Sequence, residues 1–371
     1  MKRYLLGILA VIAMASCVQE QFVPTGMSGA ISFNAPFVQS VPNRAAVDPS
    51  TTSGSIEAFD VWGFMGSNGG IVFDQKRVVR TGTAEGSDKG IWGYSAPIIY
   101  WAPNQIYHFA ALSPVDNENI KVKLADNGKM SNDGALGTVT FTNPDGKLDL
   151  LYAQSEPITT ATQEELIANT PVVSFVFQHL LTKVKFTFKN GFPSEYNSLK
   201  VTNIRMKVPN AGSVDLTQSR PYQWEVSSAY DALTLSFGNA VNTTFSSKGI
   251  LLGSGEVGES EFECLTLPVK EGAKLLIEFD VELYQGSEVA IPKITRTAEL
   301  IFDGSINKIE TGGRQSPLTA LEQGKGYRIN AILTGENVFD DKLLEIKFGL
   351  ITVGEWEDNE NPEQNENVEL Q

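Results

Sequence analysis

The chain has 371 residues, and 42% of them are hydrophobic, which is enough to bury the cores of two ordinary domains. Acidic side chains outnumber basic ones by 44 to 29, and the formal net charge is −15 at pH 7. A surface of this sign repels phosphate backbones, which argues against nucleic acid as a partner.

Residues 1–17 carry a targeting signal. Lys2 and Arg3 precede an apolar run, Tyr4 to Ala15, that is too short to cross a bilayer as a stable helix. The run ends in small residues and then Cys17, which is similar to the lipobox of bacterial lipoproteins, where the cysteine is lipidated. The sequence therefore predicts a signal peptide and a lipid anchor. An ordinary signal peptide that contains a cysteine is the alternative.

The following segment, 18–44, is predicted to be a propeptide that carries a removable first strand. Apolar residues alternate with polar or small ones over 27–37, which is the period of a strand with one face against a core. That face consists of Met27, Ile31, Phe33 and Phe37. A polar, proline-containing run then leads to Arg44 and Ala45, where a trypsin-like protease could cut and sever the lipid anchor. The alternative is an ordinary first strand followed by a loop with a basic residue.

From Ile56 onward the chain consists of short alternating runs separated by turn residues, a pattern typical of all-β sandwiches. Thr162 and Glu165 form a capping box that predicts one short helix before Pro171. In Val172 to Phe188 the apolar parity changes, which predicts a bend or bulge near Leu180. The predicted division is an N-terminal β-sandwich at 45–170, completed by strand 27–37 before cleavage, a C-terminal β-sandwich at 171–356 and a disordered acidic tail at 357–371.

Residues that could carry chemistry are few. The two histidines, His108 and His179, lie between apolar neighbours and are interpreted as hydrogen-bonded structural residues. Cys264 has no partner left in the mature chain and is predicted to be a buried free thiol. No metal-ligand spacing and no phosphate-binding loop occurs in the sequence, so no metal, no cofactor and no enzymatic activity is predicted. Asp-Asn-Gly at 126–128 and Asn-Asp-Gly at 132–134 are explained by turn chemistry more simply than by Ca²⁺. Counting residues excludes neither a Ser-His-Asp triad nor a catalytic carboxylate pair.

Several short markers occur in a fixed order along the chain. After the lipobox, the alternating strand and the Arg-Ala junction come an aromatic run ending in Ser-Pro at 100–114 and the strand FVFQHLLTKVKF at 175–186. GKGY at 324–327 and ITVGEWED at 351–358 follow near the C-terminus. In these features the chain resembles the fimbrillin family, the Mfa-like and FimA-like type V pilins of Bacteroides-type bacteria.

The resemblance implies two tandem transthyretin-like Greek-key β-sandwiches, export as a lipoprotein, and removal of the first strand by an arginine-directed protease. A strand of another subunit then fills the vacated groove by β-augmentation. The protein is therefore expected to be a structural or adhesive subunit of a surface fimbrium. Its expected partners are other fimbrial subunits and a host or bacterial surface receptor.

A C-terminal segment could supply the donor strand. Five apolar residues share one parity there: Leu344, Ile346, Phe348, Leu350 and Trp356. The alternative is that this segment is simply the last strand of the second sandwich.

A second function stays open at this point. Exposed tryptophans, with Trp92 and Trp101 in one candidate region, could make the protein a surface carbohydrate-binding lipoprotein of a glycan-uptake system. Core packing is the more usual role of tryptophan in a β-sandwich.

Overall fold

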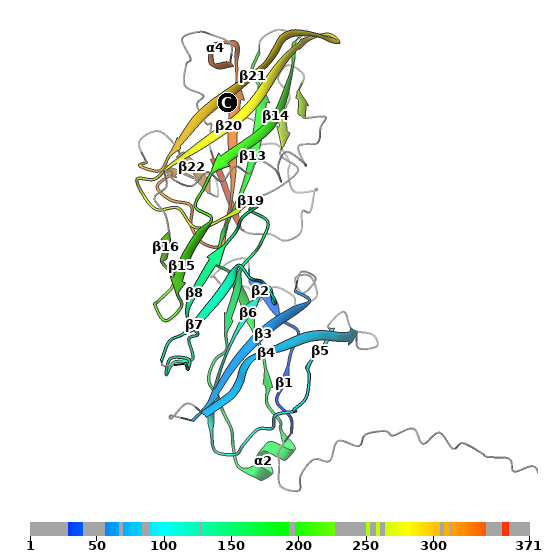
Figure 1. Cartoon of the computed structure of the whole chain (residues 1–371), viewed down its shortest axis with the longest axis vertical. Coiled ribbons are helices and arrows are strands. Elements are labelled where there is room, and N and C mark those ends of the chain that lie inside the picture. The colour runs from blue at the N-terminus through cyan, green and yellow to red at the C-terminus, as the bar shows by residue number, and fades with distance from the viewer. Residues whose placement is uncertain are drawn as a thin grey trace, which may run out of the picture.

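The computed structural model describes residues 29–39, 56–66, 70–83, 90–126, 128–192, 197–226, 250–252, 257–259, 264–304, 308–311, 314–338 and 351–355. Almost all regular structure in these residues is β-strand, which confirms the predicted all-β class. Figure 1 shows an elongated molecule, with the strands of the first half at one end and those of the second half at the other.

The described part of the chain contains two short helices. They are α2 (Gln163–Ala168) and α4 (Gly335–Val338). Thr162 caps α2, because its hydroxyl accepts a hydrogen bond from the Glu165 amide while the Glu165 carboxylate accepts one from the Thr162 amide. The predicted capping box is confirmed.

The first half is built around a ten-stranded sheet. In spatial order its strands are β11 (Val172–Val173), β1 (Ser32–Phe33), β5 (Gly90–Tyr94), β4 (Gly70–Thr83), β3 (Ala58–Met65), β6 (Ile106–Ser113), β9 (Leu151–Gln154), β12 (Val176–His179) and β2 (Phe37–Gln39), with β10 (Ile158–Thr159) beside β6. Strands β1 and β2 belong to one continuous segment, as do β11 and β12, so the two ends of this order meet. The sheet therefore closes on itself around an aromatic core.

A four-stranded sheet covers the outer face of this closed sheet. Its order is β16 (Trp224–Val226), β15 (Ala211–Asp215), β8 (Gly137–Thr142) and β7 (Ile120–Leu124). A second cluster, which includes Trp62, Leu112, Phe141 and Trp224, fills the space between the two sheets.

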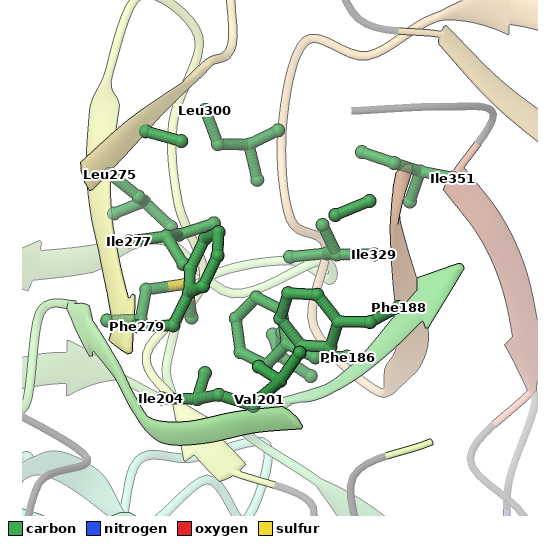
Figure 2. Packing of buried hydrophobic residues seen from close by; sticks show 14 of the residues in the cluster. Phe186, Phe188, Val201, Ile204, Leu275, Ile277, Phe279, Leu300, Ile329 and Ile351 are labelled. Atoms are coloured by element: carbon green, nitrogen blue, oxygen red, sulfur yellow. The ribbon is translucent and has the colours of Figure 1, made fainter. Parts of the chain in front are cut away.

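The second half is a sandwich of two further sheets. One has the order β17 (Ile250–Leu252), β14 (Asn197–Lys207), β20 (Lys274–Gln285) and β21 (Glu288–Ile301). The other has the order β18 (Val257–Glu259), β13 (Thr182–Asn190), β24 (Lys325–Leu333), β25 (Ile351–Glu355), β22 (Lys308–Thr311) and β23 (Arg314–Pro317), with β19 (Cys264–Thr266) beside β13. Figure 2 shows the core between them, where Phe279 and Ile277 of β20 face Phe188 of β13 and Ile329 of β24.

Leu180 and Leu181 connect the two halves directly. Both are fully buried, and they separate β12 of the first half from β13 of the second, at the predicted break in strand parity. The amide of Leu180 donates to the Leu150 carbonyl, and the Trp224 indole donates to the Leu180 carbonyl. The chain thus passes between the halves without a linker.

The strand pairing crosses the predicted domain boundary. Residues 172–179 pair with strands of the closed sheet, and β15 pairs along its length with β8. Strands from beyond residue 170 therefore contribute to the first half. The predicted ranges 45–170 and 171–356 stay a prediction about the folding units.

A buried carboxylate holds the second half together at a bulge. Asp280 of β20 is 2% exposed and accepts hydrogen bonds of 2.6 Å from both Asn203 and Thr295. Asn203 has a positive φ of 52° where the register of β14 shifts. Burial alone would raise the pKa of Asp280, but the hydrogen bonds from Thr295 and Asn203 and the charge of Lys293 hold it below its usual value.

The variant Asp280→Ala should lower the free energy of unfolding by about 1.5–3 kcal/mol, because it removes a buried carboxylate that accepts hydrogen bonds from Asn203 and Thr295. The lowered pKa means that the contribution of Asp280 is present above the unfolded-state value of about 4 and is lost as the pH falls through the folded-state value. Urea unfolding at pH 7 and pH 3 should therefore show a smaller difference between the variant and the parent at pH 3. The control Glu299→Ala removes an exposed ion pair and should cost less than about 1 kcal/mol. An equal cost of Asp280→Ala at both pH values would contradict this account.

Candidate functional site

The first strand segment, defined here as residues 29–39, lies between two neighbouring stretches of chain. On one side it runs antiparallel to 99–101 and β5. The Ile31 amide donates to the Ile99 carbonyl at 2.8 Å, and the Trp101 amide donates to the Gly29 carbonyl at 3.3 Å. Further along, Phe33 pairs with Trp92 of β5.

On its other side the segment runs parallel to 172–178. Residues 32–33 pair with 172–173, and residues 37–39 pair with 176–178. Between these two stretches, the Asn34 amide donates to the Val173 carbonyl at 2.9 Å, and the Phe37 amide donates to the Phe175 carbonyl at 3.1 Å. The two neighbours together form the walls of a groove that the segment occupies.

Tyr94 joins the segment to the antiparallel wall. Its hydroxyl donates to the Ile31 carbonyl at 3.1 Å and accepts a hydrogen bond from the Ile99 amide, also at 3.1 Å. Burial raises the pKa of Tyr94, so the hydroxyl stays protonated and keeps its donor role at neutral pH.

The side chains of the segment fill the core of the closed sheet. Ile31 is 1% exposed, Phe33 is 5% exposed and Val38 is 4% exposed. The ring of Phe33 lies with its centroid 5.6–6.4 Å from those of five other aromatic rings. These rings belong to Phe59, Phe73, Tyr94, Phe109 and Phe175. Phe33 of this segment therefore lies at the centre of the aromatic core.

The strand period changes at Pro36. Ile31 and Phe33 share the buried face, as the alternation predicts, but Phe37 is only partly buried and Val38 takes the core position. Pro36 is itself buried and cannot donate a backbone hydrogen bond. The regular parallel pairing of the segment with 172–178 is therefore interrupted at the point between β1 and β2. The sequence analysis missed Val38 for this reason, although the proline was a signal that the parity could shift.

The remaining residues of the predicted sites lie outside the described residues. They are Cys17, Met27, Arg44, Ala45, Leu344, Ile346, Phe348, Leu350 and Trp356. Residues 351–355, which lie within the candidate donor segment between Leu350 and Trp356, form β25. This strand pairs antiparallel with β24 and parallel with β22, inside the second sandwich.

The tryptophans do not form a binding platform in the described part of the chain. Trp92 is 6% exposed and Trp101 is 2% exposed, and the Trp101 indole donates to the Pro171 carbonyl at 3.1 Å. Trp62 and Trp224 are buried as well. The hypothesis that exposed tryptophans at 92 and 101 bind glycans is therefore wrong, because both side chains pack into the core beside the first strand segment.

Several residues that the sequence analysis considered for chemistry lie in structural positions: a buried histidine, a buried thiol and two turns. His179 is buried, and its Nδ1 lies 2.7 Å from a carboxylate oxygen of Asp149. Cys264 is a buried free thiol, as predicted, and burial raises its pKa far above the ordinary value. Gly128 and Gly134 have positive φ values, as their turns require. Within the described residues no group of three or more His, Cys, Asp or Glu side chains could hold a metal ion.

No helix in the described ranges has the length and hydrophobicity needed to span a bilayer.

Comparisons with known proteins place the sequence in a family. The family described as Fimbrillin-like matches residues 44–356. Among curated proteins, none matches the sequence.

Several solved structures match this chain over most of its length. A candidate cell adhesion protein from Bacteroides uniformis is 14% identical, with 90% of this chain and 100% of that chain covered and a TM-score of 0.47. A fimbrilin (FimA) from Porphyromonas gingivalis is 11% identical, with 89% and 98% covered and a TM-score of 0.41. The fimbrial anchor protein Mfa2 from Porphyromonas gingivalis is 11% identical, with 88% and 96% covered and a TM-score of 0.35. The family match extends from the Arg44 junction to the last predicted strand, and the chain belongs to the fimbrillin-like family.

Proposed function

We propose that this protein is a structural or adhesive fimbrial subunit that assembles by strand exchange and works without catalysis. It is exported as a lipoprotein through Cys17 and held at the outer membrane. An arginine-directed protease cuts between Arg44 and Ala45 and thereby frees the propeptide at 18–44. A strand from another subunit then enters the groove that the first strand segment occupied. Membership of the fimbrillin-like family supports the fimbrial role.

One observation carries the proposal: the first strand segment fills a core and pairs on both sides over 29–34 and on one side over 37–39. Its removal would expose the backbone groups of 99–101 and of 172–178 together with the sites of Ile31 and Phe33. Unpaired strand edges and alternating apolar sites are what an added strand needs. An empty groove of this kind is too costly to persist in water, so the cut protein would gain strongly by accepting a donor.

The connection after the segment allows such a cut. Gln39 pairs with Gln178, which pairs with Tyr152, then Leu112, then Asp60, so that these five residues form one row across the sheet. Four strand spacings separate the two ends of the row, at most about 20 Å. The residues between 39 and 58 have far more contour length than this span requires. A cut there breaks none of the strand pairs among the described residues.

The C-terminal sequence repeats the spacing of the groove residues. Ile31, Phe33 and Val38 are buried in the first strand segment together with Pro36, and Ile346, Phe348 and Val353 have the same identities as these three at the same intervals, with Ile351 in the place of Pro36. In this register the donor comes from a second copy of the chain. Leu344 would then replace Gly29, where even a Cβ atom would come within 2.4 Å of the Thr170 side chain, so the donor contacts begin at Ile346.

Donation has a structural cost in the donor subunit. Ile351 of β25 is buried in the core of the second half, where it lies near Ile329 in Figure 2. Residues 351–355 would have to exchange their pairs with β24 and β22 for pairs in the groove. In this register 351–355 take the places of 36–40, so they give up pairs on two sides and gain pairs with β12 on one. The gain that favours the exchange would come from Ile346 and Phe348, which take the two-walled part of the groove and its aromatic site.

Limited digestion of the full chain with an arginine-directed protease tests the proposal. N-terminal sequencing should give Ala45, and size-exclusion chromatography should show that the cut protein forms oligomers. The variant Arg44→Gln should stay uncut at this position and monomeric under the same conditions. A cut protein that loses residues 18–44 and remains monomeric at high concentration would overturn the strand-exchange mechanism.

A further inference from the structure

The two ends of the first strand segment are held unequally. Over 29–34 the segment pairs on both sides. The antiparallel wall contributes the hydrogen bonds of Ile31 and Gly29 and the Tyr94 hydroxyl, and the parallel wall contributes the pairs of β1 with β11. Asn34 adds a side-chain hydrogen bond of 2.7 Å to Ser174.

Over 37–39 the segment pairs on one side. Strand β2 is the last strand in the order of its sheet, and within the described residues it pairs with β12 alone. Pro36 contributes no backbone donor, and Phe37 is partly exposed. This end therefore has about half the backbone pairing per residue of the other end.

The side-chain contacts show the same inequality. Ile31 and Phe33 are both deeply buried, and Phe33 contacts rings on several strands. At the other end Val38 is the one large apolar side chain of 37–39 that is fully buried. Because apolar burial scales with side-chain area, the Ile31 and Phe33 end contributes more of the binding free energy.

We propose that the first strand segment opens from its 37–39 end and that an incoming strand enters the groove there, so that Ile31 and Phe33 are displaced last. Proteins open locally at the elements with the fewest pairs and contacts. The junction at Arg44 follows the weak end, so a cut there frees that end, while the strong end continues into 18–28 and the lipid-bearing Cys17. The displacement step rests on the proposed function, whereas the direction of opening is a property of the uncut protein.

The order of opening also sets the order of donor binding. The edge of β12 at 176–178 becomes available first, once 37–39 has left it. In the register given above, Val353 of the incoming strand would pair there before Phe348 reaches the aromatic site. Displacement through such intermediates never leaves the aromatic core empty.

Hydrogen exchange of the uncut full chain, resolved by mass spectrometry with fragmentation to single amides, tests the direction of opening. The amides of 37–39 should exchange at least roughly tenfold faster than those of 31–34 after correction for intrinsic rates. The variant Val38→Ala should speed exchange at 37–39 roughly tenfold and leave 31–34 within about twofold. The matched variant Ile31→Ala should instead speed exchange at 31–34.

Equal exchange over both stretches, or faster exchange at 31–34, would overturn the proposed direction. This readout needs neither cleavage nor assembly. A graded exchange in a protein whose cut form stays monomeric would support the direction of opening while rejecting the strand-exchange function. Assembly of the cut protein without this difference in exchange would support the strand-exchange function while rejecting the direction of opening.

Discussion

Replacing Phe33 by alanine should lower the free energy of unfolding of the first half by about 3–5 kcal/mol, the range for a fully buried phenylalanine that leaves a cavity. The ring contacts five aromatic neighbours from five other strands or segments, and these cannot all move inward at once. Aromatic pairs also contribute beyond their buried area, which places this site at the upper end of the range.

The effect can be measured by thermal unfolding of the uncut protein, followed by tryptophan fluorescence, because Trp62, Trp92 and Trp101 all lie in the first half. A loss of this size should lower the midpoint of that transition by roughly 10 °C. The control Phe37→Ala removes a partly exposed ring from the same segment and should cost less than about 1.5 kcal/mol. Equal shifts for the two variants would show that the segment does not fill the core as described.

The aromatic site also constrains any strand that replaces the first one. A donor with a small residue at this position would leave the same cavity that Phe33→Ala creates, whereas a donor with phenylalanine restores the contacts. Specificity between subunits would therefore depend chiefly on one position, and the neighbouring positions would contribute length and period.

Local signals in the sequence predicted the local structure well. The Thr162 capping box, the alternation of Ile31 with Phe33 and the break at Leu180 each depend on a few adjacent residues, and all three are present in the structure. The same holds for Cys264, whose burial follows from its place in an apolar strand.

Pairing between distant strands could not be predicted in the same way. Period-two alternation states which residues face a core, but it carries no information about which strand lies alongside. The pairing of β15 with β8 and the parallel pairing of 32–33 with 172–173 are of this kind. The strand at 120–124 was hidden in a polar stretch, because β7 alternates lysines with partly buried Ile120, Val122 and Leu124.

The groove itself depended on these distant pairings. The sequence placed Phe33 on a buried face, yet the contacts that make it an anchor come from residues up to Phe175. Thr170, which limits what can replace Gly29, showed no sequence signal at all. Once the walls are known, the buried residues Ile31, Phe33 and Val38 define a spacing that can be searched for in the sequence, and this is how the match at Ile346, Phe348 and Val353 arises.

Replacing Phe348 by alanine should weaken oligomerisation of the cut protein by at least about 100-fold in dissociation constant, because a loss of about 3 kcal/mol or more corresponds to two decades in affinity. In the proposed register Phe348 of one copy takes the place of Phe33 in the next and restores its five ring contacts. The dissociation constant can be measured by analytical ultracentrifugation of the Ala45 form over a concentration series.

The matched control is Leu350→Ala. In this register Leu350 takes the place of Ala35, so alanine there restores the side chain that the groove already accommodates, and affinity should change by less than about threefold. Thr170→Ala should leave the Phe348 dependence intact, since it alters only the site that faces Gly29. If Leu350→Ala weakened assembly as much as Phe348→Ala, the donor would bind in another register. If neither variant had an effect, the groove would be filled by a different segment or a different subunit, and the repeated spacing at the C-terminus would belong to the second sandwich alone.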